Sequence, residues 1–235
     1  KSEGKAKYAL GSVLGHVLLH QTINGNEAIL QMEQAGDYPD IIVGCTGGGS
    51  NLAGLMFPFL GQQLRGGQKI DIIGCEPLSC PSFTKGKYAY DHGDMARMTP
   101  LIKMHTLGSD FLPPANHSGG LRYHGMSYHL SHLYDLGLMR AKAYGQKDCF
   151  EAGVIFGKQE GIIPAPEGNH AVKGAIDAAL ECKEKGESKT ILFNLCGHGH
   201  FDMTAYDDYF SGRLADDFYD EDTANKSLSA LPEIA

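Results

Sequence analysis

The most informative stretch of the chain is Ile41-Ile42-Val43-Gly44-Cys45-Thr46-Gly47-Gly48-Gly49-Ser50-Asn51. Its first half is a short β-branched run of the kind that forms a buried parallel strand, and its second half is a tight glycine loop. A helical stretch follows through Leu60, and after the Gly66-Gly67 break comes a second β-branched run at residues 69–75. Strand, loop, helix and strand in this order predict a βαβ unit with a right-handed crossover in a parallel sheet.

The segments before and after this unit differ in regularity. Residues 7–34 contain clustered apolar side chains and are expected to form a linker followed by a helix that breaks or kinks near Gly25. Residues 76–125 hold many prolines and glycines and are expected to be irregular. A loop section of this length inside a compact chain is usually functional or built against another segment.

Order returns in the last third of the chain. We expect helices at about residues 147–160 and at 169–185, the second closed by Gly186. The apolar stripe of the second helix consists of Ala171, Val172, Ala175, Ile176, Ala179 and Leu180. A buried strand is expected at residues 190–195. The alternation predicts an α/β fold, with a mostly parallel sheet flanked by helices.

Composition excludes several classes of protein. The 235 residues are 42% hydrophobic and 20% charged, which suits a chain that buries a core. Glycine, at 31 residues, is enriched but follows no Gly-X-Y period, so a collagen-like chain is excluded. The formal charge of −8 comes almost entirely from residues 202–222, which hold eight carboxylates and Arg213. We therefore expect neither a basic surface nor nucleic-acid binding.

Neither a membrane span nor a secretory signal is expected. No window approaches the roughly 18 uninterrupted apolar residues of a span, and the opening residues lack a charged-then-apolar signal. The six cysteines are Cys45, Cys75, Cys80, Cys149, Cys182 and Cys196. They show no zinc spacing, so we expect reduced, mostly buried thiols in a cytoplasmic protein. The histidine pairs, such as His198 and His200, lack a completing ligand, and no metal site is expected.

The glycine loop carries the clearest chemical signal. Successive N–H groups and a helix N-terminus favour an anion such as phosphate, to which Ser50 and Asn51 add polar side chains. The loop lacks the Gly-Lys-Ser/Thr ending of a Walker motif, and a glycine-rich turn without a ligand is the alternative. Residues 196–199 follow the last expected strand, so they should lie beside the loop, because ligands bind beyond the carboxyl ends of parallel strands. Such a pocket suits a phosphorylated cofactor.

Five segments carry a resemblance to a known family. They are residues 44–51 (GCTGGGSN), 160–167 (EGIIPAPE), 194–199 (NLCGHG), 119–125 (GGLRYHG) and 7–12 (KYALGS). Taken in their order along the chain, they resemble the β chains of tryptophan synthase, in their divergent second type. The resemblance covers nearly the whole chain and implies the C-terminal part of a pyridoxal-phosphate (PLP) enzyme of fold type II.

The resemblance also implies roles for individual residues. Cofactor-binding positions would be Gly47, Gly48, Gly49, Ser50, Asn51, Glu167 and Cys196. Cys196 is a departure, because most members of the family have there the serine that bonds the pyridine nitrogen. Gly120 and Arg122 match the substrate-binding segment, and an arginine at this position favours an anionic group such as that of phosphoserine. The family also binds a monovalent cation through backbone carbonyls, which makes such a cation a further candidate.

A second departure is an absence from the sequence. The lysine that binds the cofactor covalently lies in a His-Lys-x-Asn motif in this family, and none of the 15 lysines here follows a histidine. The chain therefore resembles the C-terminal half alone, with no catalytic residue of its own. We expect a linker and helix from the N-terminal side over residues 1–35, a PLP-phosphate-binding α/β domain over 36–214 and an acidic C-terminal tail over 215–235.

These observations lead to one expected function and two alternatives. The expected function is the cofactor-binding half of a lyase that joins serine or O-phosphoserine to indole, giving tryptophan, and that is inactive without the other half. The missing half would be supplied in cis or in trans, and a homo-oligomer is expected. The alternatives are a non-catalytic PLP-binding or interaction module, and another fold-type-II PLP lyase.

Overall fold

A computed structural model describes residues 4–216 and 218–233. Residues 1–3 of the expected 1–35 segment, and residues 217 and 234–235 of the expected acidic tail, lie outside the described residues.

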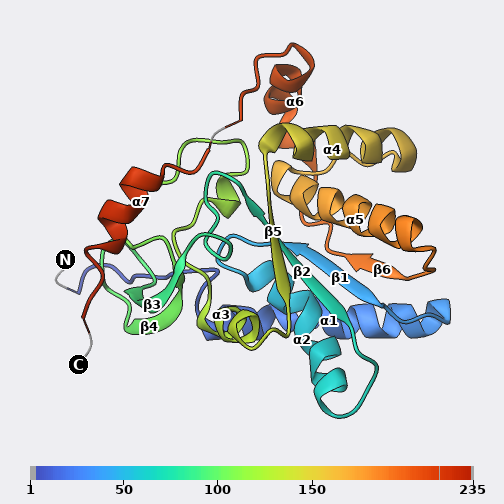
Figure 1. Cartoon of the computed structure of the whole chain (residues 1–235), viewed down its shortest axis with the longest axis horizontal. Helices are drawn as coiled ribbons and strands as arrows, with labels where there is room; N and C mark the ends of the chain where they lie inside the picture. Colours follow the sequence, from blue (N-terminus) through green and yellow to red (C-terminus); the bar gives the residue numbers. More distant parts are fainter. Residues whose placement is uncertain (1–3, 217, 234–235) are drawn as a thin grey trace.

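Four parallel strands form the central sheet. They are β1 (Ile41–Cys45), β2 (Asp71–Pro77), β5 (Arg140–Tyr144) and β6 (Ile191–Phe193), in the order β5-β2-β1-β6 (Figure 1). In the register, Ile41 of β1 lies between Asp71 and Ile191 of its two neighbours. The expected βαβ unit and the parallel α/β sheet are thus confirmed.

Helices cover both faces of this sheet. One face carries α1 (Gly15–Ala35), α2 (Ser50–Leu64) and α3 (Tyr128–Asp135), and the other carries α4 (Gln146–Glu160) and α5 (Pro166–Lys185) (Figure 1). Alternate residues of β1 serve the two layers, because successive side chains of a strand point to opposite faces. Ile42 packs in the core with α1 and α2, whereas Val43 packs in the core that contains Ala178 of α5.

The segment expected to be irregular contains an antiparallel pair of strands. These strands, β3 (Lys87–His92) and β4 (Leu101–Thr106), form a separate two-stranded sheet. The expectation for residues 76–125 was wrong to this extent. β3 is buried only at Asp91, and β4 only over its last three residues, so neither shows the continuous apolar run by which a buried strand is recognised.

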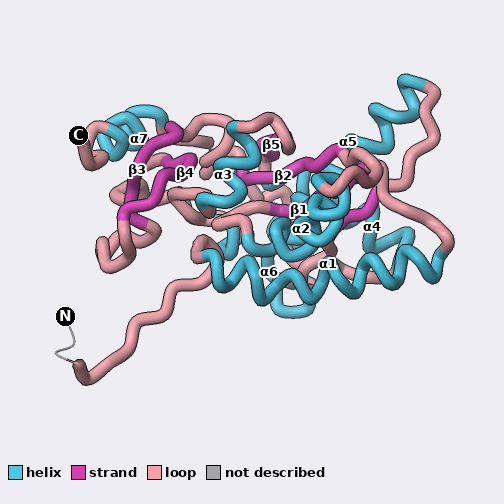
Figure 2. Tube along the Cα trace, turned by 90° about the horizontal axis from the view of Figure 1, so that it is seen from below, coloured by secondary structure: helices cyan, strands magenta, loops and turns pink. Residues whose placement is uncertain are grey.

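The remaining elements are short. The 3-10 helices η1 (Gly119–Leu121) and η2 (Gly199–Phe201) lie in loops, and α6 (Met203–Phe210) and α7 (Glu221–Leu228) follow near the C-terminus. Ala224 of α7 is buried against a small cluster that includes Phe111, so the acidic C-terminal part is docked there on the body. Residues 4–7 extend away from the body (Figure 2), whereas Tyr8 bonds to Asp94 and Val13, just before α1, is buried.

Gly25 does not break the first helix, contrary to the sequence prediction. Helix α1 runs through it without interruption for 21 residues. A Cβ added to Gly25 would lie 2.4 Å from the carbonyl oxygen of Leu55 in α2, and one added to Gly54 would lie 2.6 Å from that of Gln21 in α1. The two glycines let α1 and α2 cross at backbone contact, which explains a helical glycine better than a kink does.

Two expectations for the last third also need correction. Strand β6 is a half-buried edge strand of three residues rather than a buried strand of six, because β1 is its only partner among the residues described. Helix α5 begins at Pro166, and its buried face runs through Ala171, Ala178 and Cys182. Leu180, expected in the buried stripe, is 51% exposed.

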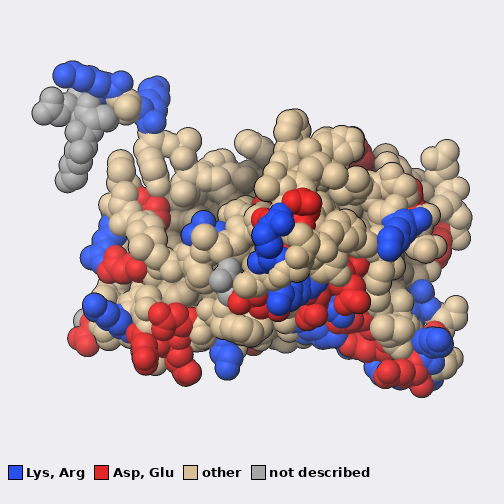
Figure 3. All heavy atoms as spheres, turned by 90° about the horizontal axis from the view of Figure 1, so that it is seen from above, with Lys and Arg blue, Asp and Glu red and all other residues tan. Residues whose placement is uncertain are grey.

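The surface and the helices add two observations. Acidic and basic side chains lie in mixed groups on the face drawn in Figure 3. Of the helices within residues 4–216 and 218–233, not one combines the length and the apolar character that crossing a membrane requires.

Candidate functional site

The glycine loop links the carboxyl end of β1 to the first turn of α2. Thr46 is buried and its N–H donates to the carbonyl oxygen of Cys75, at 2.7 Å, which fixes the start of the loop. Gly49 is the N-cap of α2, has a φ of 101° and gives the helix no side-chain cap. Within the described part of the chain, no group accepts a hydrogen bond from the N–H of Gly47, Gly48 or Gly49. These donors, with the helix N-terminus behind them, are backbone groups of the kind that suit an anion.

Three segments pack closely around this loop. A Cβ added to Gly47 would lie 2.5 Å from the carbonyl oxygen of Gly120, and one added to Gly48 would lie 2.3 Å from Oγ of Ser12. At Gly49 the added Cβ would lie 2.4 Å from Cδ1 of Leu130 in α3. At Gly47 the obstacle is a backbone atom, and at Gly49 the φ of 101° also favours glycine. The loop thus keeps its N–H groups unobstructed by side chains of its own.

Glu167 connects the loop of η1 to the start of α5. Its Oε1 accepts a hydrogen bond from the N–H of Gly120, at 2.8 Å. Because Gly120 in turn contacts Gly47, the carboxylate holds one wall of the glycine loop in place. The carboxylate also lies in the first turn of α5, where the helix dipole favours a negative charge. The structure thus brings together Glu167, Gly120 and the glycine loop.

Cys196 lies next to the same loop. The N–H of Asn194 donates to the carbonyl oxygen of Val43, which continues the β1–β6 pairing and places Cys196 beside Cys45. The two Sγ atoms are 3.4 Å apart. The hydrogen bond with Cys45 lowers the pKa of the Cys196 thiol, whereas the same bond, together with burial, raises the pKa of Cys45. Cys196 is thus the better hydrogen-bond acceptor of the pair.

Arg122 follows η1 on the exposed side of the loop. Its guanidinium donates to the carbonyl oxygen of Pro113, at 2.7 Å. A guanidinium has five N–H donors, so this bond leaves most of them available. Arg122 therefore shares a loop with Gly120 but bonds to a different segment from the one that Gly120 contacts.

Sequence reasoning missed part of the site wall. Nδ2 of Asn194 donates to Oδ1 of Asn51, at 2.7 Å, and so ties the end of β6 to α2. A cavity of about 420 Å³ opens beside this pair, with Cys196 in its wall and the α1 side chains Gln21, Asn24 and Glu27 on the other side. The spacing of these three polar side chains, three residues apart along the expected helix, was the available signal.

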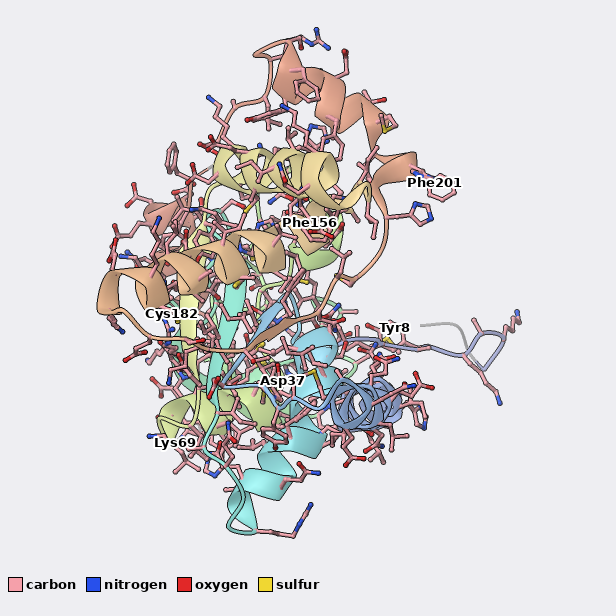
Figure 4. All side chains as sticks on the ribbon, turned by 90° about the vertical axis from the view of Figure 1, so that its right-hand side faces the viewer. Tyr8, Asp37, Lys69, Phe156, Cys182 and Phe201 are labelled. Carbon is pink, nitrogen blue, oxygen red and sulfur yellow. The ribbon has the colours of Figure 1, made fainter. Side chains whose placement is uncertain are left out.

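The histidines lie apart from these groups or are buried. The rings of His198 and His200 are 4.5 Å apart near η2, where the exposed Phe201 points away from the body (Figure 4). His170 is buried in α5, and its Nδ1 bonds to the carbonyl oxygen of Pro166 at 3.0 Å. The described residues include no group of three or more His, Cys, Asp or Glu side chains that could hold a metal ion.

Comparison with known proteins adds a family and several relatives. Residues 17–197 match the family described as pyridoxal-phosphate dependent enzyme. The chain is similar to tryptophan synthase beta chain 2 of Aquifex aeolicus, with 58% identity over 92% of this chain and 50% of that protein. Tryptophan synthase beta chain 2 of Methanosarcina mazei is also 58% identical, over 88% of this chain and 47% of that one. The chain thus spans about half the length of the curated relatives it matches.

Solved structures show the same fold at low sequence identity. An L-serine ammonia-lyase from the fungus Rhizomucor miehei superposes with a TM-score of 0.62 at 14% identity, over 86% of this chain and 58% of that one. A threonine deaminase from T.th. gives a TM-score of 0.54 at 16% identity, over 80% of this chain and 53% of that one.

Proposed function

The chain belongs to the pyridoxal-phosphate dependent enzyme family, and we propose that it is the cofactor-phosphate-binding half of a tryptophan synthase β-like lyase. The observation that carries the proposal is the set of N–H groups of Gly47, Gly48 and Gly49, which have no acceptor among the described residues. They lie at the N-terminus of α2. Cys196 contacts Cys45 just before this loop, and Glu167 bonds to Gly120, which packs against Gly47. A phosphate is the group that such a donor set fits.

The residues present fit PLP in the following roles. Gly47, Gly48, Gly49, Ser50 and Asn51 would hold the phosphate. When bound, PLP supplies an electron-withdrawing ring that permits replacement at the β-carbon of an amino acid. Cys196 would face the pyridine nitrogen, and a thiol is a weak hydrogen-bond partner that leaves this nitrogen unprotonated. Glu167 would act indirectly, because it holds the Gly120 wall against the glycine loop.

The catalytic lysine is proposed to come from the half of the relatives that this chain does not span. None of the 15 lysines here follows a histidine, as the family's motif requires. We propose that this chain alone is inactive and that the other half, in cis or in trans, completes the enzyme. A cytoplasmic location and a homo-oligomeric assembly, both expected from the sequence, are part of the same proposal.

Reconstitution tests this function. The chain is mixed with an N-terminal half that carries the His-Lys-x-Asn motif, and tryptophan formation is assayed with PLP, indole and serine or O-phosphoserine. We expect product from the mixture and none from either half alone. A well-folded complex that binds PLP but forms no product would contradict the proposed enzymatic function and favour the non-catalytic PLP-binding module. Formation of pyruvate without tryptophan would favour another PLP lyase.

Arg122 is proposed to bind an anionic substrate such as O-phosphoserine. One bond to Pro113 positions its guanidinium, and the remaining donors suit a phosphate group. In the reconstituted enzyme, we expect Arg122→Met to lower kcat/KM for O-phosphoserine by at least tenfold while leaving that for serine within a factor of three. Arg97→Met, at an exposed arginine paired with Asp110, is the matched control. Equal losses for both substrates would contradict the assignment.

A further inference from the structure

Two cysteines of the proposed cofactor site lie in sulfur–sulfur contact. Cys45 ends β1 and directly precedes the glycine loop, and Cys196 follows β6. Parallel pairing of β1 with β6 brings them together across 151 residues of sequence, with their Sγ atoms 3.4 Å apart. A disulfide requires about 2.05 Å between the sulfur atoms, a difference within reach of side-chain rotation.

The two thiols differ in access to solvent. Cys45 is 1% exposed, whereas Cys196 is partly exposed and lines the 420 Å³ cavity with Asn51 and Asn194. The hydrogen bond with Cys45 lowers the pKa of Cys196, and the thiolate is the form that reacts with peroxides. An accessible reactive thiol beside a buried resolving thiol is the arrangement found in redox-sensitive proteins.

We propose that Cys45 and Cys196 form a reversible disulfide when a peroxide reaches the site in the absence of bound cofactor. The Cys196 thiolate attacks hydrogen peroxide, so that an S–O bond forms, the O–O bond breaks and the released hydroxide takes up a proton to become water. The Cys45 sulfur then attacks Sγ of Cys196. The S–S bond forms, the S–O bond breaks, and the hydroxyl leaves as water with the Cys45 proton. The two sulfurs lose two electrons in total, and the peroxide is reduced to two waters.

The disulfide has a consequence for the cofactor that rests on the proposed function. Closing the bond draws Cys196 toward Cys45 and removes the thiol that would face the pyridine nitrogen. It also joins the segment after β6 covalently to the residue before Thr46, where the glycine loop starts. Oxidation therefore lowers the affinity for PLP, and bound PLP protects Cys196 from peroxide. A thiol reductant restores both thiols and the affinity.

The first experiment detects the bond itself and does not depend on PLP. The reduced full chain is treated with hydrogen peroxide, and its intact mass and its peptides are analysed under non-reducing conditions. We expect a linked Cys45–Cys196 peptide pair, about 2 Da lighter than the two thiols because two hydrogens are lost, which disappears on reduction. Cys45→Ser should instead leave a sulfenic acid on Cys196 that dimedone traps, and the buried control Cys182→Ser should still form the bond. A folded chain without this linked peptide overturns the proposal.

The second experiment measures PLP affinity after the reductant has been removed. We expect oxidation to weaken PLP binding at least tenfold in the wild type. In Cys45→Ser, where Cys196 is oxidised but not joined to the residue before the glycine loop, we expect a loss at least threefold smaller. Pre-bound PLP should slow formation of the linked peptide at least fivefold. If the bond forms but PLP affinity stays the same, the proposed coupling is wrong. If the reduced chain binds no PLP at all, the proposed function fails, while the mass measurement still decides whether the disulfide forms.

Discussion

His170 shows what burial does to one titratable side chain. It is 1% exposed in α5, and desolvation lowers its pKa to about 4 although Nδ1 bonds to the carbonyl oxygen of Pro166. Its Nε2 is buried without a partner among the described residues. The folded chain therefore keeps this imidazole neutral at a pH at which the unfolded chain binds a proton, which makes stability depend on pH.

We predict that His170→Gln flattens the pH dependence of stability between about pH 6.5 and pH 4. In the wild type the unfolded state gains a proton below about pH 6.5, whereas the folded state gains one only near pH 4, so stability is lost as the pH falls. The lost free energy of unfolding is about 3 kcal/mol across this window. Urea unfolding of both proteins at each pH measures the difference.

The comparison with the variant is needed because Glu76 acts in the opposite direction. Burial raises the pKa of Glu76 from 4.5 to about 7, so this carboxyl costs stability as the pH rises through that interval. Subtracting the variant's profile removes the Glu76 contribution common to both proteins. Parallel profiles for wild type and variant would show that His170 does not stay neutral.

At the scale of elements, the crossing of α1 and α2 positions the helix that begins at the glycine loop. Gly25 and Gly54 face carbonyl oxygens of the partner helix at distances that exclude any side chain. A glycine inside a helix ordinarily costs stability, by about 0.5–1 kcal/mol relative to alanine. At Gly25 and Gly54 this cost is accepted because the backbones of α1 and α2 can approach so closely only where neither residue has a Cβ.

We therefore predict opposite effects for two glycine-to-alanine changes. Gly25→Ala should lower the free energy of unfolding by about 1–3 kcal/mol, because the new methyl group overlaps the α2 backbone. Gly61→Ala in α2 should raise it by about 0.5–1 kcal/mol, since its Cβ would meet only the Arg65 side chain, at 3.4 Å. Denaturant unfolding distinguishes the two. Similar effects of both changes would refute the close crossing.

The elements also show which helices and strands could be predicted from the sequence. β1, α2 and β2 were predictable because their patterns are local: β-branched runs, a glycine loop and an apolar helix. The hairpin of β3 and β4 was not, because its half-buried strands owe their order to pairing with each other. The role of Gly25 was predicted wrongly because helix propensity describes one helix in isolation. It says nothing about the close packing of α1 against α2 that requires a glycine there.

The candidate site, too, was predictable from the sequence only in part. Parallel topology alone predicts that the glycine loop and Cys196 meet at one edge of the sheet. The bond between Glu167 and Gly120 joins residues 47 apart, and the sulfur contact of Cys45 with Cys196 joins residues 151 apart. Such distances depend on strand register and side-chain rotation, which no local pattern records.

At the scale of the whole molecule, α1 leaves an apolar surface uncovered. Leu19, Ile23 and Leu30 are 67%, 57% and 64% exposed. Leu19 and Ile23 are one turn apart, and Leu19 also lines a cavity of about 700 Å³ that includes Phe57. Exposed apolar patches of this kind mark interaction surfaces or lead to association.

We predict that the isolated chain self-associates through this surface. Light scattering should show an average mass above 25.3 kDa that rises with concentration. Leu19→Lys combined with Ile23→Lys should shift the chain toward the monomer, while the control Leu180→Lys, at an exposed leucine of α5, should not. A stable monomer of the wild type at all concentrations would contradict this prediction.

The central claim is that the loop between β1 and α2 binds PLP through its phosphate. The most direct measurement is equilibrium dialysis of the reduced chain with PLP and with pyridoxal, which lacks the phosphate. We expect PLP to bind at least tenfold more tightly than pyridoxal. Gly47→Ala, which places a methyl group against Gly120, should abolish the preference, whereas Gly119→Ala, with open space around it, should retain it. Equal affinity for PLP and pyridoxal, or an unchanged preference in Gly47→Ala, would contradict the account.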